Sequence, residues 1–199
     1  MPCVFLSFRK PDSRWMRDRV DRALSDRLGV ERIFKSGRSI TPGSDFADVL
    51  REQATSCELM CVLIGPNWLD LRDESGVRLL DREHDWVRVE IATALRAGNR
   101  VVPVLLGDAT LLPDASALPA EIADLARLQF IRVPETHLPE GLAHLADEVA
   151  ELLAAENPAD GPGDDGPDAG PEPSATMTAH VSGGGSAYMA ARDQTIRLA

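Results

Sequence analysis

The sequence has little of several features that would point to common classes of protein. It contains only three cysteines, and none of them forms the Cys-x-x-Cys spacing of a zinc or redox site. Its four histidines are scattered, so we expect no metal site. No apolar run approaches the roughly 18 residues that a transmembrane helix requires. The chain also begins directly with a strand-like segment, so we expect a cytoplasmic protein without a membrane partner.

Positive charge is also scarce. The chain carries 32 acidic and 21 basic residues, which gives a formal net charge of −11. Proteins that bind nucleic acid or anionic membranes need clustered positive charge, so we expect neither partner. The hydrophobic content of 44% is nevertheless high enough for a packed core.

Strand-like and helix-like segments alternate along the first 155 residues. The expected strands are 3–8, 32–34, 59–64, 101–106 and 129–133, and the expected helices begin near Ser13, Ser44, Asp85, Pro119 and Pro139. The run 59–64 is apolar throughout, as in a parallel strand covered on both faces. Pro103 favours a place near a sheet edge. This alternation predicts a three-layer α/β sandwich, with helices on both faces of a mainly parallel five-stranded sheet.

The composition changes after residue 155. Of the nineteen residues 157–175, nine are Pro or Gly and none is Lys or Arg. Such a segment buries too little to order itself, so 156–177 is expected to be an acidic, disordered linker. The last segment, 178–199, contains the only tyrosine and partly alternates as a strand does. The predicted organisation is therefore a domain over 1–155, a linker and a short C-terminal motif.

The segment around Trp86 and Glu90 is the most informative part of the chain. These two residues are four positions apart, so in a helix they project to the same side. The helix is expected to begin after Asp85 and to end at Gly98-Asn99, which are good capping residues. Both side chains then lie at the edge of the buried face, where a carboxylate is half-buried. Spacing alone favours the plainer interpretation, an aromatic core anchor beside a solvated charge.

A group of basic residues follows the first two expected strands: Arg9, Lys10, Lys35 and Arg38. Ligands of parallel α/β sheets bind beyond the carboxyl ends of the strands, so these cations could hold an anionic group such as a diphosphate. The residues alone favour ordinary loop solubility. No phosphate-binding loop, receiver aspartate or nucleophile elbow accompanies them.

Five motifs in this order resemble those of Toll/interleukin-1 receptor (TIR) domains of the stand-alone bacterial kind. They are Val4–Arg9, Ile40–Phe46, Leu63–Trp68, Asp85–Ile91 and Val102–Leu105. The resemblance covers roughly residues 1–155 and implies a flavodoxin-like fold. TIR domains include modules that bind one another and enzymes that cleave NAD⁺ at the nicotinamide–ribose bond.

For the enzymatic branch, the resemblance implies that Glu90 is catalytic and that NAD⁺ is the substrate, with no cofactor. The implied substrate-binding residues are Phe8, Arg9, Lys10, Ser36, Arg38, Phe46 and Trp86. The implied gating or interface loop contains Gly37, Ile40, Pro42 and Gly43. Many relatives have an acidic residue where this chain has Ser36, which puts one polar contact in doubt. Related enzymes usually need self-association, often completing the site across two chains.

The chemistry agrees with this resemblance. Cleavage leaves an oxocarbenium-like ribose while nicotinamide departs as a neutral group, so one carboxylate suffices where most glycosidases use two. We expect Glu90 to engage the ribose hydroxyls and to stabilise the developing cation. Trp86 and Phe8 are expected to shield the site or to stack on the nicotinamide. Arg9 and Lys10 are expected to hold the diphosphate, with Arg38 as a further candidate.

Other functions stay open at this point. A non-enzymatic adaptor would use the same fold only for TIR–TIR contact, although Glu90 argues against it. The segment 178–199 is similar to amyloid-type signalling motifs of bacterial immune effectors, which pair with motifs on nucleotide-binding sensor proteins; a tail without a role is equally compatible. The product (ADP-ribose, a cyclic isomer or a base-exchanged dinucleotide) is not determined by the sequence, and anti-phage defence by NAD⁺ depletion rests on the family alone.

Overall fold

The sheet of this protein contains five strands in the order β2-β1-β3-β4-β5. It is seen in a computed structural model that describes residues 4–35, 45–109 and 111–156. The strands are β1 (Val4–Phe8), β2 (Ile33–Phe34), β3 (Leu59–Ile64), β4 (Arg100–Leu106) and β5 (Ile131–Val133). All neighbouring pairs are parallel, which confirms the predicted α/β fold. The predicted linker from residue 157 onward, the C-terminal motif and the loop residues 36–43 lie outside the described residues.

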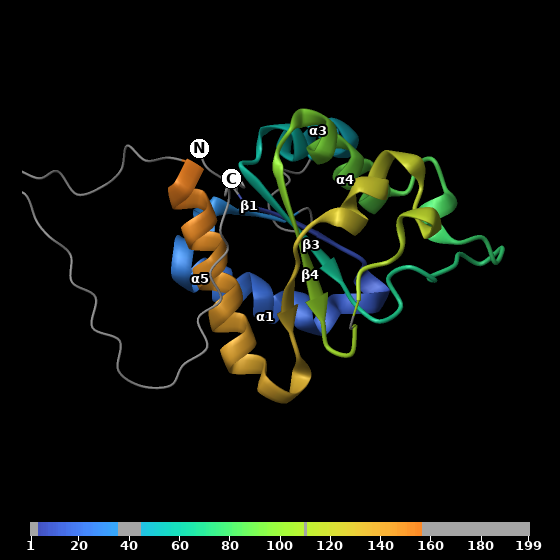
Figure 1. The fold of residues 1–199 in the computed structure, drawn as a ribbon. Coiled ribbons are helices and arrows are strands. Elements are labelled where there is room, and N and C mark those ends of the chain that lie inside the picture. Colours follow the sequence, from blue (N-terminus) through green and yellow to red (C-terminus); the bar gives the residue numbers. More distant parts are fainter. Residues whose placement is uncertain (1–3, 36–44, 110, 157–199) are drawn as a thin grey trace, which may run out of the picture. The chain divides into compact units, whose positions relative to one another are not determined.

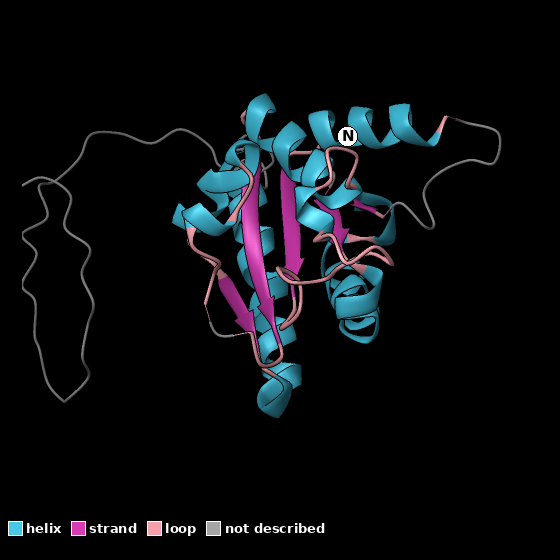
Figure 2. Ribbon diagram, turned by 90° about the vertical axis from the view of Figure 1, so that its right-hand side faces the viewer, coloured by secondary structure: helices cyan, strands magenta, loops and turns pink. Residues whose placement is uncertain are grey.

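Helices cover both faces of the sheet (Figures 1 and 2). The α-helices are α1 (Lys10–Leu28), α3 (Phe46–Ser56), α4 (Trp86–Ala97) and α5 (Leu138–Glu156). One core cluster joins α1 and α5 to one face of the sheet, and a second joins α3 and α4 to the other. Short 3₁₀ segments connect these elements: η1 (Val30–Arg32), η2 (Leu79–Asp81), η3 (Ala115–Ala117), η4 (Ala120–Arg127) and η5 (Glu135–His137). None of the described helices has the length and apolarity needed to cross a bilayer.

Strand β1 shows how the sheet distributes its side chains between the two layers. Phe5 belongs to the cluster with α3 and α4, whereas Val4 and Leu6 belong to the cluster with α1 and α5. Because successive side chains of a strand point to opposite faces, Ser7 lies on the α4 side and Phe8 on the α1 side. This alternation determines which residues of β1 can reach the candidate site.

The predicted helix starts needed two corrections. Asp45 rather than Ser44 caps α3, because its carboxylate accepts hydrogen bonds from the amides of Ala47 and Asp48. Phe46 is the first residue of that helix and is 44% exposed. Helix α1 begins at Lys10 rather than Ser13, which instead lies at a kink with non-helical backbone angles.

Pro103 was predicted to lie near a sheet edge, but the strand that contains it is not an edge strand. Strand β4 lies inside the sheet, between β3 and β5. However, β5 pairs only with Val104 to Leu106, so its pairing begins one residue after Pro103. Among the described residues, the first half of β4 therefore has no strand partner on the side of β5. A proline, which lacks a backbone N–H, is tolerated where a strand has no neighbour.

Candidate active site

Glu90 lies on α4, which begins and ends where the sequence predicted. The carboxylate of Asp85 accepts a hydrogen bond from the backbone N–H of Arg88 at 2.9 Å, and Gly98 ends the helix in the left-handed conformation with φ of 76°. Glu90 itself is only 7% exposed. It is therefore more deeply buried than the half-buried rim position that helical spacing predicted, because it turns toward β1.

The partner of Glu90 is Ser7. The hydroxyl of Ser7 donates a hydrogen bond to Oε2 of Glu90 at 2.7 Å, and Ser7 is fully buried. Sequence reasoning did not assign Ser7 to the site. One signal was available: Ser7 is a polar residue in an apolar strand, two positions after Phe5, so the period of two places both side chains on the same face.

Burial raises the pKa of Glu90 to about 8. The hydrogen bond from Ser7 opposes this shift, the nearby charge of Asp85 adds to it, and Arg9 weakly opposes it. Loss of water around a carboxyl group penalises its ionised form, which is why burial dominates. A carboxyl group with a strongly raised pKa beside specific charged partners is a candidate functional group.

Arg9 and Asp85 form a buried ion pair next to Glu90. The two terminal nitrogens of Arg9 donate to the two carboxylate oxygens of Asp85, each at 2.8 Å. The side chains are 4% and 9% exposed, respectively. The guanidinium also lies 5.7 Å from the ring centroid of the buried Trp68. Arg9, predicted to bind the diphosphate, is thus engaged by the protein and joins the end of β1 to the start of α4.

The predicted group of basic residues is not gathered at one point among the described residues. Lys35 forms an ion pair with Asp21 of α1, and Arg9 is held by Asp85. Lys10 is exposed at the start of α1, and Arg38 lies outside the described residues. Among the described members of this group, Lys10 is therefore the one whose exposed side chain can contact an anionic ligand.

Trp86, one helical turn before Glu90 on α4, packs against a second exposed aromatic ring, that of Phe46. Trp86 is 39% exposed, and its ring packs edge-to-face on Phe46 with centroids 5.4 Å apart. Each is the first residue of its helix, α4 and α3 respectively. Phe8 is not part of this pair. Its ring packs with the cluster of α1 and α5, under the guanidinium of Arg17 at 4.7 Å, so the structure places Phe8 on the sheet face opposite to Glu90.

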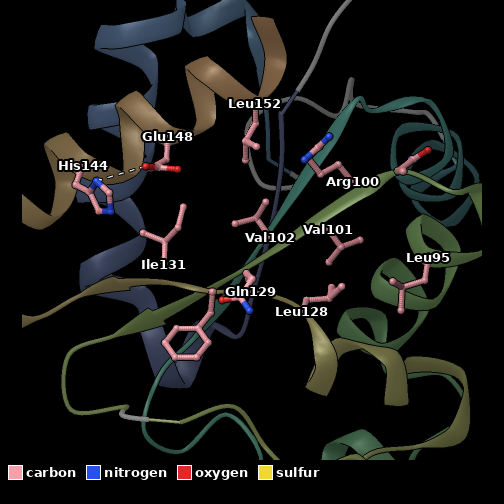
Figure 3. Close-up of a pocket in the computed structure, with 12 residues that line it drawn as sticks. Leu95, Arg100, Val101, Val102, Leu128, Gln129, Ile131, His144, Glu148 and Leu152 are labelled. Carbon is pink, nitrogen blue, oxygen red and sulfur yellow. Dashed lines mark ion pairs between the residues drawn. The ribbon is translucent and has the colours of Figure 1, made fainter. Parts of the chain in front are cut away.

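A separate pocket of about 510 Å³ lies at the amino-terminal end of β4 (Figure 3). Val101 and Val102 of β4 are among the residues that line it. His144 and Glu148 line the side formed by α5, with 3.9 Å between His144 Nδ1 and Glu148 Oε1. It contains none of the residues that the sequence predicted for the site. Because Ser7 lies near the carboxyl end of β1, this pocket and Glu90 belong to different ends of the parallel sheet.

The fold and the site define a parallel α/β domain with a buried carboxyl group near the carboxyl end of a central strand. A family model described as TIR domain matches residues 4–146, and the chain belongs to this family. A search of curated proteins gave no significant match.

Two solved structures of TIR domains are similar to this chain. The first contains the TIR domains of the activated Roq1 resistosome directly recognizing the pathogen effector XopQ; it has 14% identity, a TM-score of 0.59, and covers 75% of this chain and 99% of its own. The second is the TIR domain of the Toll-related receptor TRR-2 from Hydra magnipapillata; it has 13% identity, a TM-score of 0.50, and covers 75% and 97%, respectively. At these identities the likeness concerns the fold.

Proposed function

We propose that this protein is an NAD⁺ glycohydrolase that cleaves the nicotinamide–ribosyl bond, with Glu90 as its catalytic residue. The observation that carries the proposal is the Glu90 carboxyl group, which is buried, held by Ser7 and raised in pKa to about 8. An ionisable group in this environment costs folding stability. That cost is understandable if the same environment strengthens the interaction of the carboxylate with a cation.

The proposed reaction needs one carboxylate. The bond between ribose C1′ and the pyridinium nitrogen breaks, and its electron pair stays on nitrogen, so nicotinamide leaves as a neutral molecule. The positive charge passes to the ribose as an oxocarbenium ion, which Glu90 stabilises while it binds the ribose hydroxyls. Water then attacks C1′ and releases a proton. A carboxylate poor in surrounding water interacts with this cation more strongly than a solvated one does.

The raised pKa links substrate binding to the active charge state. With a pKa of about 8, Glu90 is mostly protonated at neutral pH in the free domain. The pyridinium of NAD⁺ is positively charged, and a nearby positive charge favours the ionised form of a carboxyl group. Binding of the substrate would therefore promote the loss of the proton that catalysis requires.

The other predicted residues take different roles in the proposal. Trp86 and Phe46 offer an exposed aromatic surface for stacking on the nicotinamide or for shielding it. Lys10 would contact the diphosphate, whereas Arg9 acts through Asp85 rather than on the substrate. Phe8 has no role in it. The contacts of Ser36 and Arg38, and gating by the loop with Gly37, Ile40, Pro42 and Gly43, stay predictions from the family resemblance.

Self-association through the TIR domain and a role in cytoplasmic anti-phage signalling also belong to the proposal. The exposed pair Phe46 and Trp86 is compatible with contact to a second copy. Segment 178–199 would pair with a sensor protein. A non-enzymatic adaptor would need the same exposed surface, but it has no use for a buried, destabilising carboxyl group. That difference favours the enzyme.

The test is to incubate concentrated protein with NAD⁺ and to measure free nicotinamide by chromatography. The parental protein and a Glu151→Gln control, altered at an exposed residue of α5, should release nicotinamide. Glu90→Gln should release it at least about 100-fold more slowly, since it removes the stabilising charge. Release by Glu90→Gln at the parental rate, or none by the parental protein at any concentration, would remove the proposal.

A further inference from the structure

We infer that Ser7 is a positioning residue, which holds one oxygen of Glu90 so that the other is presented to the ribose. The inference rests on the proposed function and assigns a role within it to a residue of the sheet. It starts from the buried hydrogen bond of 2.7 Å between the Ser7 hydroxyl and Oε2 of Glu90.

The end of β1 fixes α4 at two points. Ser7 and Arg9 are two positions apart, so both side chains leave the strand toward the α4 side. Ser7 binds Glu90 within the helix, while Arg9 binds Asp85 at its cap with two hydrogen bonds. Strand β1 itself pairs with β3 along its whole length, from Val4 to Phe8. The hydroxyl therefore projects from a rigid element, and the helix that carries Glu90 is tied to the same strand end.

The two oxygens of Glu90 differ in their surroundings. Oε2 accepts the hydrogen bond from Ser7, whereas no described residue donates a hydrogen bond to Oε1. Glu90 as a whole is 7% exposed. One oxygen is thus anchored and the other is free to accept a hydrogen bond from a ribose hydroxyl.

Ser7 also affects which form of the carboxyl group is present. A hydroxyl that donates to a carboxylate favours the ionised form, and this contribution opposes the effect of burial at Glu90. Removing the hydroxyl would leave both the orientation of Glu90 and its ionisation less favourable. A residue that served only the stability of the fold would affect unfolding, but not the maximal rate reached when Glu90 is fully ionised.

The experiment compares Ser7→Ala, Ser7→Thr and a control, Ser25→Ala. Ser25 lies on α1, and its hydroxyl makes no hydrogen bond to any described residue. Nicotinamide release is measured as kcat/KM across pH. The carboxyl carbon of Glu90 is followed by ¹³C NMR in glutamate-labelled protein, and its signal is identified by its absence in Glu90→Gln.

For Ser7→Ala we expect the NMR midpoint of Glu90 to rise by about one pH unit, and kcat/KM at pH 7 to fall about 10- to 100-fold. Its maximal rate at high pH should also stay below the parental rate. Ser7→Thr, which keeps the hydroxyl, should remain within a few-fold of parental, and Ser25→Ala should be unchanged.

The outcomes separate the two proposals. If the parental protein releases nicotinamide and Ser7→Ala matches it in rate and pH profile, the positioning role is overturned while the enzyme remains. If the parental protein is inactive, the proposed function fails. In that case, if the NMR midpoint of Glu90 titration is unchanged in Ser7→Ala, the inferred hydrogen bond of Ser7 to the Glu90 carboxylate is also overturned. A raised midpoint would support that hydrogen bond.

Discussion

Replacing Glu90 with glutamine should make the domain more stable, by an amount that grows with pH. The ordinary pKa of 4.5 applies to the unfolded chain, and burial raises the pKa in the folded state to about 8. Below pH 4.5 both states hold the proton, so ionisation has no effect on stability. Between pH 4.5 and 8 the unfolded state releases the proton while the folded state retains it, and stability is lost as pH rises.

The size of this effect follows from the two pKa values. Each pH unit in this window costs about 1.4 kcal/mol, so the folded protein should lose about 5 kcal/mol by pH 8 relative to pH 4 through Glu90 alone. Glutamine cannot ionise, and the variant avoids this loss. The difference in unfolding free energy between Glu90→Gln and the parental protein should therefore be small at pH 4, increase up to pH 8 and then become constant.

The assay is urea unfolding followed by tryptophan fluorescence at several pH values between 4 and 9. Only the difference between variant and parental protein is interpreted, because other titrating groups contribute equally to both. Glu151→Gln, at an exposed position, should show a difference that does not vary with pH. If the difference for Glu90→Gln were also constant within about 0.5 kcal/mol, Glu90 would ionise as an ordinary solvated carboxyl group, and burial would not raise its pKa.

Two further predictions concern the neighbours of Glu90. Arg9→Ala should destabilise the fold by about 3–5 kcal/mol, because it leaves the buried carboxylate of Asp85 without its partner. Urea unfolding measures this loss, and a loss below about 1 kcal/mol would contradict a buried ion pair. Trp86→Ala should slow nicotinamide release and raise KM for NAD⁺ at a stability cost of about 1 kcal/mol, since the ring is 39% exposed. Steady-state kinetics would contradict the second prediction if KM and kcat stayed at their parental values.

The fold and the helix of Glu90 were predictable because their signals are local. Apolar runs and their alternation with helical segments gave the sheet, and the capping residues Asp85 and Gly98 gave both ends of α4. Helical spacing also placed Trp86 and Glu90 on one side. It did not give the depth of Glu90, because depth depends on what packs against the helix.

The contacts that define the site were not predictable from local patterns. Ser7 and Glu90 are 83 positions apart, and Arg9 and Asp85 are 76 apart. Pairing across such distances is decided by the sheet order and the strand alternation together. Phe8 was predicted to bind the substrate because it lies in the same motif as Arg9. It directly follows Ser7, however, and therefore points to the other face of the sheet.

In the proposed reaction, the ionised form of the buried Glu90 carboxyl group promotes the cleavage of NAD⁺. This role is tested most directly by the pH dependence of kcat/KM for nicotinamide release, which reports the ionisation of the free enzyme. We predict that kcat/KM rises with pH and that the midpoint of this rise lies near pH 8. The same pH should mark the point at which the difference in unfolding free energy between Glu90→Gln and the parental protein becomes constant. A rate that falls as pH rises through this range, or a midpoint near the ordinary carboxyl value of 4.5, would show that the ionised, buried Glu90 is not the catalytic group.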